Sequence, residues 1–240
     1  MSRGVFITGT DTDVGKSVVA AVIARLAAMA GLNTGVMKPV TSGCSQRDGV
    51  RISPDAELLA YGAGMETLSP QATPYLFTAP LAPSVAAEKE GVRINLEKIA
   101  GDYDSLAARH DFMVVEGAGG LMVPLAGGLL VADLILRLNL PVVVVARPGL
   151  GTVNHTLLTC LAARQMGISV IGVVISGFPD DPDEAEASAP HLIGSLSGAP
   201  LLGIFPRIDL ADPCHVVDAI VDRIVREPLT TILRKELGLV

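Results

Sequence analysis

Short apolar runs alternate along this chain with longer segments in which alanine and leucine recur at helical spacing. The short runs are rich in valine and isoleucine, which is typical of strands buried on both faces of a sheet. We expect strands at residues 5–8, 34–38, 112–116, 141–146, 170–176 and 201–204. We expect helices at residues 16–30, 55–60, 82–90, 96–110, 132–138, 154–166, 183–195 and 215–225. This alternation predicts an α/β fold with a three-layer, doubly wound, mostly parallel sheet.

Glycine and proline divide the pattern. Gly31 and Gly167 each follow a predicted helix, where glycine readily takes the left-handed conformation that ends helices. Residues 39–83 are the least regular part of the chain and follow the carboxyl end of a strand. Ligands bind at such ends in open α/β sheets, so we expect loops that shape a substrate site there. No linker or repeat interrupts residues 1–240, which predicts a single domain.

The clearest chemical signal lies between the first strand and the first helix. The residues from Gly9 to Ser17 are Gly-Thr-Asp-Thr-Asp-Val-Gly-Lys-Ser, which is the layout of a phosphate-binding P-loop. In this motif the Lys16 ammonium reaches the β- and γ-phosphates and the Ser17 hydroxyl can ligate Mg²⁺. Thr10 stands where the standard motif has its first glycine, and Gly9 lies one residue earlier. The alternative is a plain glycine turn, but the strand-to-helix position favours a nucleotide-binding protein.

Charge and composition exclude several classes of protein. The formal net charge is −7, which argues against a general nucleic-acid or anionic-membrane surface. The apolar stretch 119–138 is interrupted by Pro124, Asp133 and Arg137, so it does not predict a membrane span. The three cysteines are far apart, as expected for free thiols in a reducing compartment. With the first strand starting near residue 5, we expect no signal peptide and a cytoplasmic protein.

Three further segments follow predicted strands. Lys38 precedes Pro-Val-Thr-Ser-Gly, Glu116 precedes Gly-Ala-Gly-Gly, and Gly149-Leu-Gly-Thr-Val-Asn-His opens a helix. Taken singly, they could be a solvated strand-end charge, a glycine turn with an incidental acid, and ordinary helix capping. Because the carboxyl ends of parallel strands meet at one edge of a sheet, we expect all four segments to converge on one cleft.

With these four segments in order, the chain resembles the ATP-dependent dethiobiotin synthetases of the P-loop NTPase superfamily along nearly its whole length. The resemblance implies a cyclo-ligase of biotin biosynthesis. Such an enzyme inserts CO₂ between the two amines of 7,8-diaminopelargonate (7,8-diaminononanoate) and so closes the ureido ring of dethiobiotin. It also implies Mg²⁺, conversion of ATP to ADP and phosphate, and passage through a carbamate and a carbamic-phosphoric anhydride.

The resemblance further implies a role for individual residues. The catalytic cations are Lys38 and Lys16, beside the carbamate and the γ-phosphate. The magnesium ligands are Ser17, Asp55 and Glu116. The substrate contacts are Thr12 and Ser42, with Gly151, Thr152, Val153 and Asn154 reached across the two-fold interface of a homodimer. The nucleotide contacts are Asp13, Val14, Gly15, Lys16, Ser17, Val18, Asp55, Glu116, Gly117, Ala118, Gly119, Ser176, Gly177, Pro206, Arg207 and Ile208.

Two of these roles have a simpler alternative, and a third residue departs from the family pattern. Asp55 follows Ser-Pro, where an acid in the first turn of a helix is common without any metal. Arg207 lies beside a proline and could be an ordinary surface arginine. Ser176 stands where the family often carries an asparagine that contacts adenine. A hydroxyl matches a base edge less well than an amide, so the base preference stays open.

Two other classes of function compete with the ligase. Switch or partitioning ATPases of the P-loop class usually carry a second lysine five residues before the P-loop lysine, but Asp11 holds that position here. Amidotransferases that activate carboxylates with ATP add a glutaminase domain with a catalytic cysteine, and 240 residues leave no room for one. The sequence therefore favours a ligase acting on small molecules, with no nucleic-acid or membrane partner.

Overall fold

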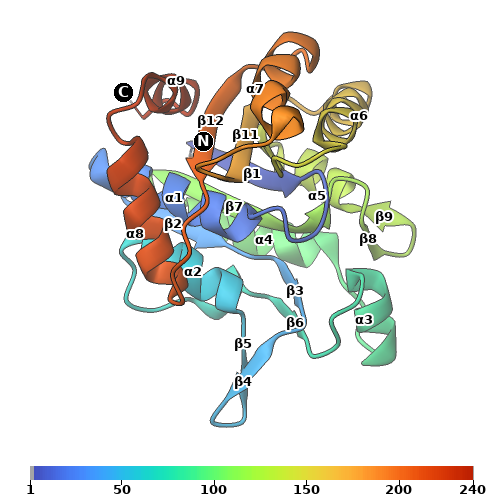
Figure 1. The fold of residues 1–240 in the computed structure, drawn as a ribbon. Coiled ribbons are helices and arrows are strands. Elements are labelled where there is room, and N and C mark those ends of the chain that lie inside the picture. Colours follow the sequence, from blue (N-terminus) through green and yellow to red (C-terminus); the bar gives the residue numbers. More distant parts are fainter. Residues whose placement is uncertain (1–2, 240) are drawn as a thin grey trace.

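A six-stranded parallel sheet forms the centre of the computed structural model, which describes residues 3–239. The strand order is β12-β11-β10-β1-β7-β2, and every neighbouring pair is parallel (Figure 1). The six strands are β1 (Arg3–Gly9), β2 (Thr34–Met37), β7 (Phe112–Gly120), β10 (Val142–Ala146), β11 (Val170–Phe178) and β12 (Leu201–Pro206). Each lies where the sequence predicts a strand, so the doubly wound fold class is confirmed.

Helices cover both faces of this sheet. One face carries α1 (Lys16–Met29), α2 (Pro54–Ala63), α8 (Pro213–Ile224) and α9 (Pro228–Glu236). The other carries α3 (Pro83–Lys89), α4 (Leu96–Ala107), α5 (Val131–Leu138), α6 (Thr152–Gln165) and α7 (Glu184–Leu196). The eight predicted helices are all present, with ends that differ by up to three residues. Helix α9 was not predicted, because its Thr-Thr-Ile run weakens the helical pattern.

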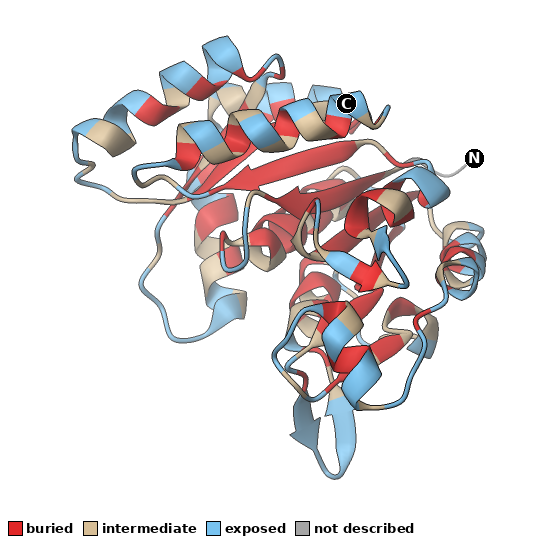
Figure 2. Ribbon diagram, turned by 90° about the vertical axis from the view of Figure 1, so that its right-hand side faces the viewer, coloured by how far each residue is buried: buried red, intermediate tan, exposed pale blue. Residues whose placement is uncertain are grey.

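The sheet is buried on both faces, which accounts for its unbroken apolar strands. Along β1, Val5 and Ile7 pack into one hydrophobic cluster while Phe6 packs into the other. Figure 2 shows this arrangement as a buried sheet between helices whose outer sides are exposed. Because the alternate side chains all find an apolar partner layer, the strand ends are fixed relative to one another.

Several short elements connect this framework. Residues 39–83 contain a parallel pair, β3 (Val40–Ser42) with β6 (Tyr75–Phe77), and the 3₁₀ turn η1 (Pro70–Ala72). The hairpin of β4 (Ser45–Arg47) and β5 (Val50–Ile52) projects from the body of the molecule (Figure 1). A second small pair is formed by β8 (Pro124–Ala126) and β9 (Leu129–Leu130). These two- and three-residue strands carry too little pattern to be predicted from the sequence.

Close packing of α2 on α1 positions one edge of the site. A Cβ on Gly62 would collide with the carbonyl group of Ala21, so glycine allows the two helices to approach. Arg25 of α1 donates from Nε to the Gly62 carbonyl at 3.0 Å and from Nη2 to the Tyr61 carbonyl at 3.2 Å. As a result the first turn of α2, which carries Asp55, lies beside the first turn of α1.

Two expectations about the chain can be checked directly. Its three cysteines, Cys44, Cys160 and Cys214, are all free. Among the described residues no helix has both the length and the apolar composition that crossing a membrane requires.

Candidate active site

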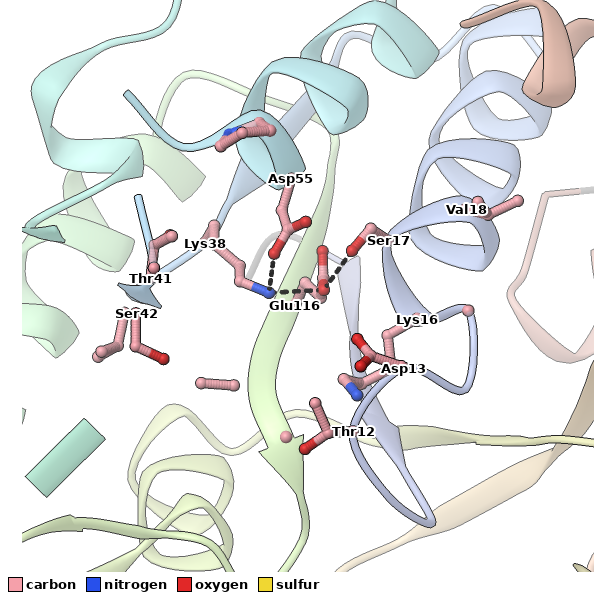
Figure 3. Close-up of a pocket in the computed structure, with 16 residues that line it drawn as sticks. Thr12, Asp13, Lys16, Ser17, Val18, Lys38, Thr41, Ser42, Asp55 and Glu116 are labelled. Atoms are coloured by element: carbon pink, nitrogen blue, oxygen red, sulfur yellow. Dashed lines mark hydrogen bonds and ion pairs between the residues drawn. The ribbon is translucent and has the colours of Figure 1, made fainter. Parts of the chain in front are cut away.

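A cavity of about 480 Å³ opens at the carboxyl ends of β1, β2 and β7 (Figure 3). Three of the four segments singled out in the sequence meet there, and α2 adds Asp55. The lining residues are Thr12, Asp13, Gly15, Lys16, Ser17, Val18, Lys38, Val40, Thr41, Ser42, Gly43, Pro54, Asp55, Glu116, Ala118 and Gly119. The structure therefore brings together the residues expected to contact phosphate, metal and substrate amines.

The loop before α1 is shaped to receive an anion. Gly15 has φ +88°, a left-handed conformation in which any other residue is strained, and no side chain caps the start of α1. The first backbone N–H groups of the helix are thus left for a ligand, and the helix dipole favours a negative one. The Lys16 ammonium, nearly buried, donates to the carbonyl oxygen of Asp11 at 2.8 Å. Burial and the nearby Lys38 charge lower the pKa of Lys16, although the negative charge of Glu116 acts to raise it.

Lys38 is held between two carboxylates. Its Nζ lies 2.6 Å from Oε1 of Glu116 and 2.8 Å from Oδ2 of Asp55, and it donates to the Gly117 carbonyl at 3.3 Å. Figure 3 shows the three side chains pointing toward one another, from the residue after β2, from β7 and from α2. Lys38 and Glu116 are 4% and 1% exposed, whereas the Asp55 side chain is 40% exposed. The contact between Lys38 and Glu116 is therefore buried, whereas the contact between Lys38 and Asp55 is open to the cavity.

The charges of this cluster follow from burial and contact. Burial alone would lower the pKa of Lys38, but the carboxylates of Glu116 and Asp55 outweigh it and raise that pKa, so the lysine stays charged. Burial likewise opposes ionisation of Asp55, yet the Lys38 ammonium holds the Asp55 pKa below its ordinary value. Burial raises the pKa of Glu116, and Lys38 opposes that rise. The contacts within this cluster therefore favour the charged form of Lys38 between the carboxyl groups of Glu116 and Asp55.

The donor set of this cluster fits a hard divalent cation. Ser17 donates from Oγ to Oε1 of Glu116 at 2.9 Å, so the hydroxyl and both carboxylates form one group. Oε2 of Glu116 is buried and makes no hydrogen bond to any described residue. Oxygen-only ligation of this kind suits Mg²⁺. No group of three His, Cys, Asp or Glu side chains suited to a metal occurs within residues 3–239, so the hydroxyl is needed to complete this set.

A second cavity of about 440 Å³ adjoins the first along the P-loop. Asp13, Gly15 and Val18 line both cavities. The second cavity is also lined by Val14, Arg147, Pro148, Ser176, Gly177, Pro179, Glu186, Pro206, Arg207, Ile208, Val216 and Ile220. Together the two spaces form a groove that passes from the P-loop lysine to the ends of β11 and β12.

Some lining residues of the second cavity were missed from the sequence. Arg147 directly follows β10 and is exposed, and no described residue pairs with its guanidinium. Its place after a strand is a signal that could have identified it. Glu186 is harder to find, because its Oε2 accepts from the Asp183 backbone N–H in a capping box and it looks like an ordinary helix-start acid.

Two details of the sequence prediction were wrong. Glu116 does not end its strand, because β7 continues to Gly120 and pairs with Gly9 through a shift in register. The fourth segment does not join the cleft either: Gly151, Thr152, Val153 and Asn154 line neither cavity. Helix α6 instead packs along β10 through Cys160 and Ala163.

The start of α6 nevertheless has the features of an anion site. Gly151 has φ +92° and no side chain caps the helix. The Thr152 backbone N–H bonds to the Gly149 carbonyl at 3.1 Å, and the buried Thr152 hydroxyl has no partner among the described residues. Free donors at a helix N-terminus favour a carboxylate or phosphate.

Comparison with known sequences relates the chain to one group of enzymes. The family model described as AAA domain matches residues 3–214. The ATP-dependent dethiobiotin synthetase BioD of Bacillus licheniformis is 41% identical over 222 residues, which cover 92% of this chain and 93% of the relative. The Bacillus subtilis protein of the same name is 42% identical, covering 86% of this chain and 88% of the relative. That of Thermodesulfovibrio yellowstonii is 41% identical, covering 87% and 90%.

Comparison with solved structures concerns the fold alone. A ParA family ATPase from Chlorobium tepidum superposes with a TM-score of 0.58 at 16% identity, covering 100% of this chain and 99% of that one. The MinD cell division protein of Aquifex aeolicus gives 0.58 at 13% identity, covering 99% and 96%. The chain thus shares its architecture with these two proteins, while its sequence is far more similar to the dethiobiotin synthetases.

Proposed function

The chain belongs to the ATP-dependent dethiobiotin synthetase family, and we propose that it closes the ureido ring of dethiobiotin in the cavity around Lys16, Lys38 and Glu116. The reaction joins CO₂ to 7,8-diaminopelargonate and converts ATP to ADP and phosphate. One observation carries the assignment of the site: two lysines and two carboxylates converge beside a P-loop at the ends of three adjacent strands. A pocket that only bound nucleotide would not need Lys38.

The nucleotide lies along the groove formed by the two cavities. The N–H groups at the start of α1 and the Lys16 ammonium bind the phosphates, and the γ-phosphate faces Lys38. The base occupies the second cavity, between Ser176 at the end of β11 and Arg207 after β12. This direction is supported by the three residues that line both cavities, because a single ligand passing along the P-loop would contact all of them.

Ser17, Asp55 and Glu116 would hold Mg²⁺ on the phosphates. The ion supplies positive charge that offsets the negative charge of the triphosphate as phosphoryl transfer proceeds. The unpartnered Oε2 of Glu116 supports this proposal, since a buried carboxylate oxygen without a donor is costly unless a ligand contacts it.

The reaction proceeds in three steps. One substrate amine attacks CO₂, forming an N–C bond and losing a proton, which gives a carbamate anion that the Lys38 ammonium stabilises. A carbamate oxygen then attacks the γ-phosphorus, and the bond from that phosphorus to the β–γ bridging oxygen breaks, so ADP leaves. The second amine attacks the carbonyl carbon of the resulting carbamic-phosphoric anhydride, the C–O bond to phosphate breaks, and the proton lost by that amine passes to the departing phosphate. Attack of one anion on another is the difficult step, which the two lysines facilitate.

The substrate contacts come from both sides of the cavity. Thr12 and Ser42 line opposite walls and face the space beside Lys38 (Figure 3). The carboxylate of the substrate tail binds the start of α6 in a partner copy, because the α6 start of the same chain lies outside the cavity. The apolar side chains of Leu150, Leu158 and Leu161, exposed on and just before α6, support a homodimer in which this helix is covered.

A direct assay tests this function. Purified protein is incubated with ATP, Mg²⁺, bicarbonate and 7,8-diaminopelargonate, and both dethiobiotin and phosphate are measured. We expect one phosphate per ring closed and no steady release when the diamino acid is omitted. Phosphate release that depends on DNA or a partner protein would indicate a switch ATPase instead, and release that requires glutamine would indicate an amidotransferase.

A further inference from the structure

Lys38 occupies the position that a metal ion needs. Its ammonium contacts Oε1 of Glu116 at 2.6 Å and Oδ2 of Asp55 at 2.8 Å. Ser17 donates to the same Glu116 oxygen. These three side chains are the proposed magnesium ligands, so the lysine and the metal draw on one set of oxygens. A metal ion that takes Oε1 of Glu116 and Oδ2 of Asp55 excludes the ammonium from them, because Nζ already contacts both oxygens and the two cations repel each other.

The electrostatics of the pocket require a cation at this position. Glu116 is 1% exposed and lies on the same small site as Asp55. Two neighbouring carboxylates, one of them buried, are destabilising without a counter-ion, and a lysine or a metal removes that penalty. Lys16 acts on these acids without a direct contact, because its ammonium is bonded to the Asp11 carbonyl and not to either carboxylate. Lys38 is therefore the cation that neutralises the acidic pair when no metal is bound.

We propose that Lys38 is the resident counter-ion of the metal site and that Mg²⁺ displaces it, which frees its ammonium for the carbamate. The proposal rests on the function proposed above and adds an order to it. Until the metal arrives, Lys38 is bound to Glu116 and Asp55 and cannot stabilise a second anion. After displacement the lysine, anchored at the end of β2, faces the cavity that Thr12 and Ser42 line.

This competition has a thermodynamic consequence for the free enzyme. The metal binds only the population in which Lys38 has left the carboxylates, so its apparent affinity is reduced by the fraction of that population. Removing the lysine removes the competition. Metal affinity in the absence of nucleotide therefore reports on the proposed role without any turnover.

The experiment measures Mn²⁺ binding to the free protein by electron paramagnetic resonance, without nucleotide or substrate. Lys38→Met should bind Mn²⁺ at least about tenfold more tightly than wild type. Lys38→Arg, which keeps a cation among the carboxylates, should bind as weakly as wild type. The matched control is Lys235→Met in α9, which removes the same charge from an exposed residue outside the cavity and should leave the affinity unchanged. Equal or weaker binding by Lys38→Met would overturn the proposal.

A measurement on the wild-type protein guards against a variant that fails to fold. Lys38 is 4% exposed, so an amine-reactive acylating reagent should label it slowly, as quantified by peptide mass spectrometry. Saturating Mg²⁺ should increase that labelling at least about threefold, because the displaced ammonium enters the open cavity. An unchanged or slower rate would contradict the displacement. Neither result depends on ring closure, so failure of this proposal and failure of the ligase assay are distinguishable.

Discussion

The two cavities that meet at the P-loop differ in how their polar groups are held. Around Lys38 the charged side chains are paired with one another at 2.6 and 2.8 Å, and most of them are buried. Around the buried Ser176 the charged side chains are more exposed, and among residues 3–239 the Arg207 side chain pairs only with its neighbour Asp209. The phosphate end is constrained by mutual charge contacts, whereas the base end is open. We therefore expect catalysis to be sensitive to single changes and base preference to be adaptable.

The largest effect is expected at Lys38. Lys38→Gln should lower kcat at least about 10³-fold, because the carbamate loses the cation that stabilises it. ADP affinity should change little, since the phosphates bind mainly the α1 start and Lys16. Steady-state ring closure and calorimetric ADP binding check the two halves of the prediction, and a near-normal kcat would show that the paired charges of this cavity are not required.

A smaller change is expected at the metal ligands. Glu116→Gln should raise the Mg²⁺ concentration for half-maximal turnover at least about tenfold, because an amide oxygen replaces a charged ligand. The same variant retains the shape of the side chain, so the fold should be preserved. A titration of turnover against Mg²⁺ measures the effect, and identical curves for variant and wild type would rule out ligation by Glu116.

A substitution in the second cavity should change the preference for the nucleotide base and leave the rate with ATP nearly unchanged. Ser176→Asn adds an amide that both donates and accepts hydrogen bonds at the second cavity. We expect the ratio of kcat/KM for ATP over CTP and GTP to rise several-fold while kcat with ATP stays within about twofold. A fall in kcat as large as that of a Lys38 variant would mean that the two ends are not as different as the structure indicates.

The smallest effect concerns Glu90, the residue that ends α3. Glu90 accepts from the Thr78 backbone N–H at 2.8 Å and pairs with Arg51 of the β4–β5 hairpin. The Thr78 hydrogen bond and the Arg51 contact lower the Glu90 pKa below its ordinary value of 4.5. The folded state therefore binds fewer protons than the unfolded one near that pH, and the stabilisation is present above pH 4.5 and lost as the pH falls.

Glu90→Gln tests this linkage by thermal unfolding. At pH 7 the variant should melt below wild type, and the difference in Tm should shrink as the pH falls from 6 to 3. Glu88→Gln is a suitable control, because Glu88 lies in the last turn of α3, two residues before Glu90, and is exposed. A Tm difference that stays constant over this range would show that Glu90 contributes through packing and not through its charge.

The sequence predicts the sheet far better than the connections. The strands of the central sheet are buried on both faces. Runs such as Val142–Ala146 can therefore be recognised in the sequence as unbroken apolar segments. The β4–β5 hairpin is exposed on both sides, and its residues carry no alternation that a burial argument could use. Its place depends on contacts from Arg47 to Glu57 and from Arg51 to Glu90, which only the folded chain brings together.

The candidate site shows the same division. Motif spacing identifies Lys16 at the start of α1, Lys38 directly after β2, and Glu116 before the glycines that end β7. It does not reveal that Lys38 binds both carboxylates, since that contact depends on α2 packing close against α1 through Gly62. Spacing likewise places the α6 segment in the cleft, whereas the path of that helix along β10 keeps it out.

The central claim is that an oxygen of the captured CO₂ attacks the γ-phosphate in this cavity, and oxygen labelling tests it most directly. Bicarbonate and CO₂ labelled with ¹⁸O are mixed rapidly with excess enzyme, Mg²⁺, ATP and 7,8-diaminopelargonate in unlabelled water, and the phosphate is analysed by mass spectrometry after one turnover. The account predicts phosphate that carries one ¹⁸O atom for each ring closed. Unlabelled phosphate formed together with dethiobiotin would contradict it.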